Sequence, residues 1–158
     1  MSFNREQFKT IITQKLEEFG YGVCSPVAVN LLLGTAAQES RFGTYLYQLG
    51  GGPALGVFQM EPITEADIWR NYLSFKHKIK YRVTHICNTD GPDVDKLQYD
   101  LGYQIVMVRL QYYRRPEPLP AADDLSGLAK YYKLHFNSVI GKATEADFIK
   151  NYQLYVKG

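Results

Sequence analysis

Apolar residues recur every three or four positions along most of the chain, which is the spacing of amphipathic helices. The first such run extends from Phe8 to Phe19, and Asn4 precedes it at the place where an N-cap residue is expected. Ser25 followed by Pro26 is a strong start signal for the next helix, because proline suits the first helical position. The pattern predicts helices over residues 5–19, 26–42, 65–76, 94–115, 124–136 and 145–156.

Side chains that cap helices mark two of these starts. Thr64 with Asp67, and Thr144 with Asp147, have the spacing of capping boxes. No segment longer than four residues alternates apolar and polar side chains as a half-buried strand does. The fold class expected from the sequence is therefore mainly α.

The second predicted helix is apolar on nearly every side over residues 27–37, so we expect it at the centre of the fold. Glu39 lies near its end and is the only acidic residue between positions 19 and 60. Low dielectric and the negative end of the helix dipole both raise the pKa of such a carboxyl. A carboxyl that keeps its proton near neutral pH suits general acid catalysis. From these residues alone, an outward-facing Glu39 paired with Arg41 or water is an equal alternative.

Composition limits the class of protein. The chain has 158 residues, 46% of them apolar, and a formal net charge of +2. These values indicate one globular domain over residues 1–158 and argue against a disordered chain. The chain contains no stretch of roughly 20 apolar residues, the length that a membrane-spanning helix requires. Its N-terminus lacks the apolar region of a secretory signal. We expect synthesis in the cytoplasm without a Sec signal, and free thiols at Cys24 and Cys87.

Three short elements follow one another in order from Glu39 onward. The pair Glu39–Ser40 ends the predicted buried helix, and Gln59 lies 20 positions after Glu39 in the segment Gly56-Val57-Phe58-Gln59-Met60. On a later helix comes the pair Phe136–Asn137. Together these elements resemble the signature of the soluble lytic transglycosylases and goose-type lysozymes of the lysozyme-like superfamily. The run over 131–137 is also similar to that of phage-borne members.

The resemblance implies a lysozyme-like fold in which Glu39 is the only catalytic carboxyl. It implies cleavage of the β-1,4 bond between MurNAc and GlcNAc in the glycan strands of peptidoglycan. In a lytic transglycosylase the C6 hydroxyl of the sugar then attacks, and 1,6-anhydroMurNAc forms. The residues that would bind substrate are Ser40, Gly56, Phe58, Gln59, Met60, Tyr131, Tyr132, Phe136 and Asn137.

The chain departs from the family at one position of the third element. The family usually has Tyr before the Asn, where this chain has Phe136. Because Tyr132 lies four residues earlier on the same helical face, we expect its hydroxyl to orient Glu39 instead. Two other functions stay open: a muramidase or endolysin that admits water, and a weakly active or inactive virion structural or glycan-binding protein. Chitinase-type activity on a similar fold is a third.

The expected setting follows from the same resemblance. It implies a monomer at the bacterial cell wall or periplasm, as a phage virion component or as a lysis enzyme released through a holin. Glu61, the nearest second carboxylate, is interpreted as a solvated loop residue. The acid-free basic and aromatic run over 70–82 is typical of a solvated helix face, so nucleic acid is not an expected partner. His77, His85 and Cys87 lack zinc-ligand spacing, and we expect neither metal nor cofactor.

Overall fold

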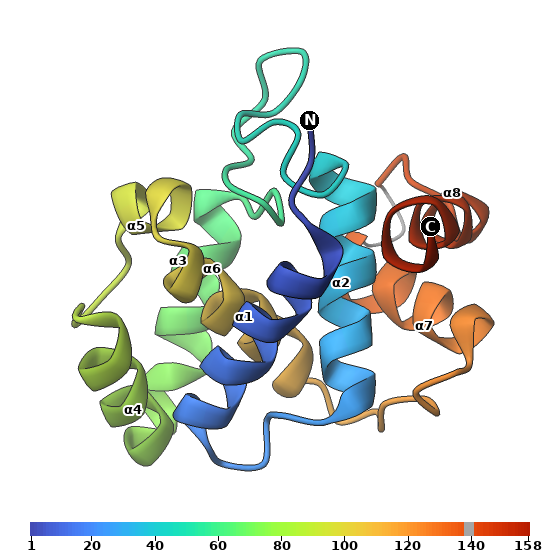
Figure 1. The fold of residues 1–158 in the computed structure, drawn as a ribbon. Coiled ribbons are helices and arrows are strands. Elements are labelled where there is room, and N and C mark those ends of the chain that lie inside the picture. Colours follow the sequence, from blue (N-terminus) through green and yellow to red (C-terminus); the bar gives the residue numbers. More distant parts are fainter. Residues whose placement is uncertain (138–140) are drawn as a thin grey trace.

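The structure, a computed structural model, describes residues 1–137 and 141–158 and is built from helices (Figure 1). The described residues form no strand and only two isolated β-bridges, so the mainly α class is confirmed. The α-helices are α1 (Arg5–Phe19), α2 (Pro26–Ser40), α3 (Pro62–Asn71), α4 (His77–Cys87), α5 (Val94–Tyr99), α6 (Leu101–Tyr113), α7 (Leu125–Tyr132) and α8 (Glu145–Asn151). Shorter segments are the 3₁₀ turn η1 (Leu73–Phe75) and the π-helical η2 (Lys133–Asn137) and η3 (Tyr152–Lys157).

Helix α2 is the centre of this arrangement. The Ser25 hydroxyl accepts a hydrogen bond from the Ala28 N–H at 3.1 Å, and Pro26 occupies the first turn, as predicted. The helix contacts α1, α6, α7 and α8, which bury it on nearly every side (Figure 1). A carboxyl near the end of such a helix therefore stands at the edge of the apolar core.

The chain leaves α2 through three consecutive residues in the left-handed region. Arg41, Phe42 and Gly43 have φ of 49°, 60° and 79°. Since helical residues have negative φ, the helix ends at Ser40 rather than near residue 42. The Ser40 hydroxyl accepts a hydrogen bond from the Gly43 N–H at 2.8 Å. This turn fixes the end of α2 on which Glu39 lies.

Helix α8 approaches α2 closely at Gly34. A Cβ at this position would lie 2.3 Å from the Phe148 ring and 2.9 Å from the Tyr152 ring. Only glycine therefore permits this approach. The contact brings α8 to the end of α2, where Asn151 donates a hydrogen bond to Gln38 at 2.7 Å.

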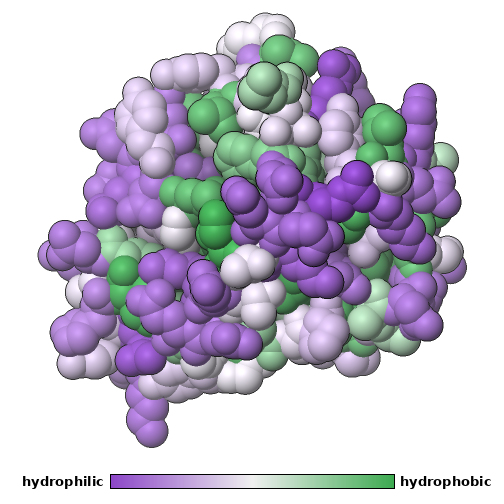
Figure 2. All heavy atoms as spheres, viewed as in Figure 1, coloured by the Kyte–Doolittle hydropathy of each residue, from purple (hydrophilic) through white to green (hydrophobic). Residues whose placement is uncertain are grey.

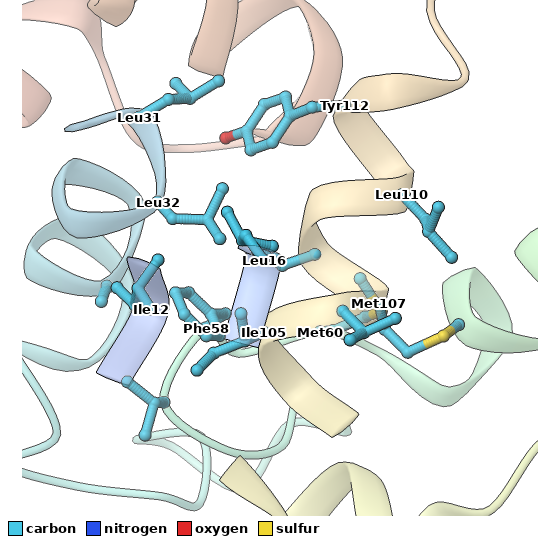
Figure 3. Close-up of a cluster of buried hydrophobic side chains, with 14 of the residues drawn as sticks. Ile12, Leu16, Leu31, Leu32, Phe58, Met60, Ile105, Met107, Leu110 and Tyr112 are labelled. Atoms are coloured by element: carbon cyan, nitrogen blue, oxygen red, sulfur yellow. The ribbon is translucent and has the colours of Figure 1, made fainter. Parts of the chain in front are cut away.

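Apolar side chains from α1, α2 and α6 meet in the core (Figure 3). Phe58 and Met60, from the loop before α3, join them and are 1% and 3% exposed. Burial contributes about 1.5–3 kcal/mol for a side chain of this size. The core therefore anchors the loop that carries Gln59.

The surface is mixed in character. On the face in Figure 2, hydrophobic areas are small and separated by hydrophilic ones. Within residues 1–137 and 141–158, no helix has both the length and the apolar character needed to cross a membrane.

Local signals predicted two helix starts well. α1 begins after Asn4 and α8 after Thr144, and both side chains accept the expected capping hydrogen bonds. The start expected at 65 is wrong: α3 begins at Pro62, and Thr64 lies inside the helix. Proline at the first position already provides a helical φ, so no side-chain cap is needed there.

Two other expectations about helices need correction. The single helix expected over 94–115 is two, because Asp100 has extended backbone and its carboxylate accepts from the Tyr103 N–H at 3.0 Å. The bounds of α4 were not predicted, although its first half lies in the run over 70–82 that is typical of a solvated helix face. Its buried residues are Val83 and Cys87, and so narrow an apolar stripe gives a weak helical pattern in the sequence.

Candidate active site

A groove of about 1040 Å³ runs past the end of α2. Its walls come from five parts of the chain: Gln38 and Glu39, the loop over 45–54, the segment over 59–67, the end of α6 over 111–115, and residues within 134–137 and 141–143. This volume lies at the upper end of the range of about 300–1,000 Å³ that is typical of ligand pockets.

The Glu39 carboxyl lines this groove and is half-buried. Burial disfavours the charged form and raises the pKa of Glu39 from 4.5 to about 7, while the hydrogen bond from Tyr132 opposes the rise. The outward-facing alternative, with Glu39 paired to Arg41, is not what the structure has: no ion pair joins them among the described residues. Glu39 is thus a carboxyl that can hold a proton at neutral pH beside a large groove.

Tyr132 reaches Glu39 from α7. Its hydroxyl donates a hydrogen bond to Oε1 of Glu39, so the contact expected from the sequence is confirmed. The Tyr132 ring is fully buried, with the Phe136 and Phe148 ring centroids 5.9 Å and 5.0 Å away. Burial and the neighbouring carboxyl raise the pKa of Tyr132 far above its ordinary value, so its hydroxyl stays protonated and can donate to Glu39. Phe136, which has no hydroxyl, supports the ring that supplies one.

Hydrogen bonds from two other segments also fix the end of α2 at Gln38 and Glu39. The Tyr45 hydroxyl donates to the Glu39 carbonyl at 2.9 Å, which satisfies one of the free carbonyls at the end of α2. Gln38, next in the chain, accepts from the Asn151 amide at 2.7 Å through its side-chain oxygen. Its amide nitrogen is then left to donate toward the groove that Gln38 lines. The sequence pattern did not single out Gln38, whose partner Asn151 is 113 residues away, or Tyr45, which returns to Glu39 only because the chain turns at the end of α2.

Gln59 also lines the groove, and its backbone is in a strained conformation. Its φ is +50°, and its amide nitrogen donates to the Gly56 carbonyl at 2.9 Å. The side-chain oxygen is therefore the group left to accept a hydrogen bond from a ligand. Gly56 has φ +78°, and a Cβ there would meet the Leu97 carbonyl oxygen at 2.7 Å. This turn requires glycine for its backbone, independently of any ligand.

The structure divides the predicted site residues into two groups. The first lines the groove: Glu39, Gln59, Met60, Phe136 and Asn137. The second is buried outside the lining: Ser40, Gly56, Phe58, Tyr131 and Tyr132. Only the first group is placed to touch a ligand in this groove, and the direct contact expected of the second group stays a prediction that the groove lining does not support.

Asn137 and Tyr131 show this division. The Asn137 side chain lines the groove, and its oxygen accepts from the Lys133 ammonium at 2.7 Å. Tyr131, in contrast, points its hydroxyl to the Glu117 carbonyl at 2.8 Å. Ser138, which follows the Phe136–Asn137 pair, lies outside the described residues.

Two further carboxylates line the groove, and neither resembles Glu39. Asp67 accepts from Arg114 and from Asn71, both at 2.6 Å, and these hydrogen bonds lower its pKa. Asp67 is thus held as an anion. Glu61 is exposed, as the sequence indicated. Glu65, the next acidic residue after Glu61, is fully buried and does not line the groove.

The basic and aromatic run over 70–82 lies outside the groove lining. It covers the end of α3, η1 and most of α4, with Phe75 and Tyr81 exposed. Arg82 donates to the Glu18 and Phe19 carbonyls at 2.8 Å and 3.0 Å and so attaches α4 to α1. The run therefore has a structural use that accounts for at least one of its charges.

Metal-ligand geometry is not found in the described part of the chain, where no cluster of three His, Cys, Asp or Glu side chains could hold an ion. Cys24 is half-buried and Cys87 buried, and both are free thiols. Comparisons with protein-family models, curated proteins and solved structures found no match. The lining of the groove thus combines one protonatable carboxyl, hydrogen-bonded by a buried tyrosine, with the side-chain amides of Gln38, Gln59 and Asn137.

Proposed function

We propose that the protein is a lysozyme-like peptidoglycan lytic transglycosylase with Glu39 as its single catalytic carboxyl. The observation that carries the proposal is the environment of Glu39: a groove-lining carboxyl whose pKa is raised to about 7 by burial and whose orientation is fixed by Tyr132. General acid catalysis needs a group that holds a proton at working pH and can release it.

The chemistry follows from the two oxygens of this carboxyl. The Tyr132 hydroxyl donates a hydrogen bond to Oε1 of Glu39. No described side chain forms a hydrogen bond with Oε2, so in the proposed reaction Oε2 is the oxygen that exchanges a proton with the substrate. Glu39 donates its proton to the glycosidic oxygen as the bond to C1 of MurNAc breaks. The resulting carboxylate accepts the proton of the C6 hydroxyl while the C6 oxygen bonds to C1. The 1,6-anhydro product forms and Glu39 is protonated again. The Tyr132 hydroxyl stabilises the transient carboxylate by a charge-assisted hydrogen bond.

Most glycosidases use two carboxyl groups, so the second must be accounted for. The hydrogen bonds from Asn71 and Arg114 lower the pKa of Asp67, which makes it a poor base. The C6 hydroxyl of the sugar supplies the second function in the proposed reaction. The second candidate function is a muramidase. The position of Glu61 favours it, because an exposed carboxylate in the groove lining is placed to activate water.

Digestion of purified peptidoglycan separates these activities. The wild-type protein and the Glu39→Gln and Glu61→Gln variants are incubated with cell wall, and the soluble products are analysed by mass spectrometry. The proposal expects 1,6-anhydroMurNAc ends from wild type and Glu61→Gln and none from Glu39→Gln. Reducing-end MurNAc that depends on Glu61 would show a muramidase. Binding to insoluble wall with no release would show a glycan-binding protein.

A further inference from the structure

The α6 end of the groove carries two consecutive arginines that differ in their partners. Arg114 is engaged at both terminal nitrogens: Nη1 pairs with Asp67 at 2.6 Å and Nη2 donates to Gln111 at 2.6 Å, whereas its Nε, like that of Arg115, is buried without a partner among the described residues. Its side chain is 11% exposed. Arg114 is thus a fixed part of the groove wall rather than a free charge.

Arg115 also lines the groove, yet the described residues provide its side chain with no hydrogen-bond or ion-pair partner. Its Nε is buried and unpaired. Asp67, whose pKa the charge of Arg115 helps to lower, forms its ion pair with Arg114. Glu117 lies outside the groove lining, with its carboxylate 3.6 Å from the His135 ring. Arg115 is therefore a groove-lining guanidinium whose donors are not taken up by the side chains or backbone of the described residues.

A guanidinium in this position fits a carboxylate, because its planar set of donors matches the two carboxylate oxygens. Neutral polymers of GlcNAc carry no carboxylate. Muramyl glycans carry one on the lactyl group when it is free, and several on the stem peptide when it is attached. Both sources offer the same chemistry to Arg115.

We propose that Arg115 binds a carboxylate carried by the glycan strand, and that this contact makes the groove select acidic muramyl glycans over neutral GlcNAc polymers. The inference rests on the proposed function, since it assumes that a glycan lies in the groove beside Glu39. It concerns binding at one end of the groove, which can be measured without turnover.

The experiment measures affinity by calorimetry in a Glu39→Gln background. Three probes are used: a neutral GlcNAc tetramer, a peptide-free GlcNAc–MurNAc tetramer with free lactyl carboxylates, and the same tetramer bearing stem peptides. Arg115→Gln is compared with Arg115→Lys, which keeps the charge but loses the planar donor set. Arg70→Gln is the matched control, because Arg70 is exposed and lies outside the groove lining.

We expect Arg115→Gln to weaken binding of a carboxylate-bearing probe about fivefold to tenfold, with Arg115→Lys losing less and Arg70→Gln nothing. The neutral tetramer should bind equally to all variants. Loss confined to the peptide-bearing probe would identify the stem carboxylates, and loss on the peptide-free probe the lactyl group. Equal weakening of all three probes, or no change in any, would overturn the proposal. Failure of the proposed function would appear separately, as wild-type protein that cleaves no wall.

Discussion

Two buried tyrosines in this protein donate to a glutamate carboxyl, and the two pairs differ in almost every other respect. Tyr132 donates to Glu39 at the groove, while Tyr103 donates to Glu65 in the interior. Glu65 is fully buried, and it accepts a second hydrogen bond from the Asp93 N–H at 3.0 Å. Glu39 faces a space large enough for substrate. A tyrosine–glutamate contact is therefore not evidence of catalysis by itself; access to the groove distinguishes the two.

The interior pair has a structural use. The Tyr103 hydroxyl accepts from the Trp69 indole N–H at 3.0 Å while it donates to Glu65. These hydrogen bonds join α3 to α6 and to the N-cap of α5 at Asp93. None of the four residues lines the groove. The Glu65–Tyr103 pair thus fixes helices, whereas the Glu39–Tyr132 pair positions one carboxyl oxygen.

Replacing the two glutamates gives the largest expected contrast. Glu39→Gln keeps the shape and removes the proton, so wall cleavage should fall by about 10³-fold or more with little change in the melting temperature. Glu65→Gln should leave cleavage per folded molecule nearly unchanged. Turbidity clearance of purified wall measures both. Substantial cleavage by Glu39→Gln would mean that another group is the acid.

Removing the interior hydroxyl should act on stability. Tyr103→Phe leaves the Trp69 N–H without its acceptor and takes one donor from the Glu65 carboxyl in a buried region, which should cost about 2–4 kcal/mol of unfolding free energy. Urea denaturation measures this change. A loss of cleavage with unaltered stability would contradict the assignment of this pair to structure.

The matching change at the groove should act on activity. Tyr132→Phe removes the donor that orients Glu39, and cleavage should fall about 10- to 100-fold. Because the Tyr132 hydrogen bond lowers the pKa of Glu39, the loss of activity at high pH should move to higher pH in the variant. The pH profile of kcat/KM checks this. A uniform loss with an unmoved profile would indicate misfolding or misplaced packing instead.

The smallest effect concerns stability as a function of pH. Between 4.5 and about 7 the native state holds the Glu39 proton that the unfolded chain has already lost. The free energy of unfolding must therefore fall as pH rises through this window and level off above it. We expect Glu39 to lower the free energy of unfolding by about 1–3 kcal/mol across this pH window. The Glu39→Gln variant should lack this contribution. Denaturation at pH 5 and pH 8 compares the two proteins.

Sequence reasoning found the features that depend on neighbouring residues. The caps at Asn4, Ser25 and Thr144 were predicted because a cap and its partner lie within three residues of each other. The isolation of Glu39 in an apolar helix could also be read directly. Its contact with Tyr132, 93 residues away, was expected only because of a family resemblance.

The features that were missed depend on distant segments. Tyr103 lies 38 residues from Glu65, and no local spacing indicates that they meet. Arg114 and Arg115 are adjacent and chemically identical, yet only the fold pairs one of them with Asp67. Asp100 divides a continuous apolar pattern because its side chain caps α6, which the periodicity alone does not show.

The central claim is that the Glu39 carboxyl keeps its proton near neutral pH. The most direct test is a ¹³C NMR titration of the glutamate side-chain carboxyl carbons in wild-type protein, with the Glu39 signal assigned by its absence in Glu39→Gln. The account predicts a midpoint at about pH 7 for this signal. A midpoint near 4.5, the ordinary value for a solvated glutamate, would contradict it.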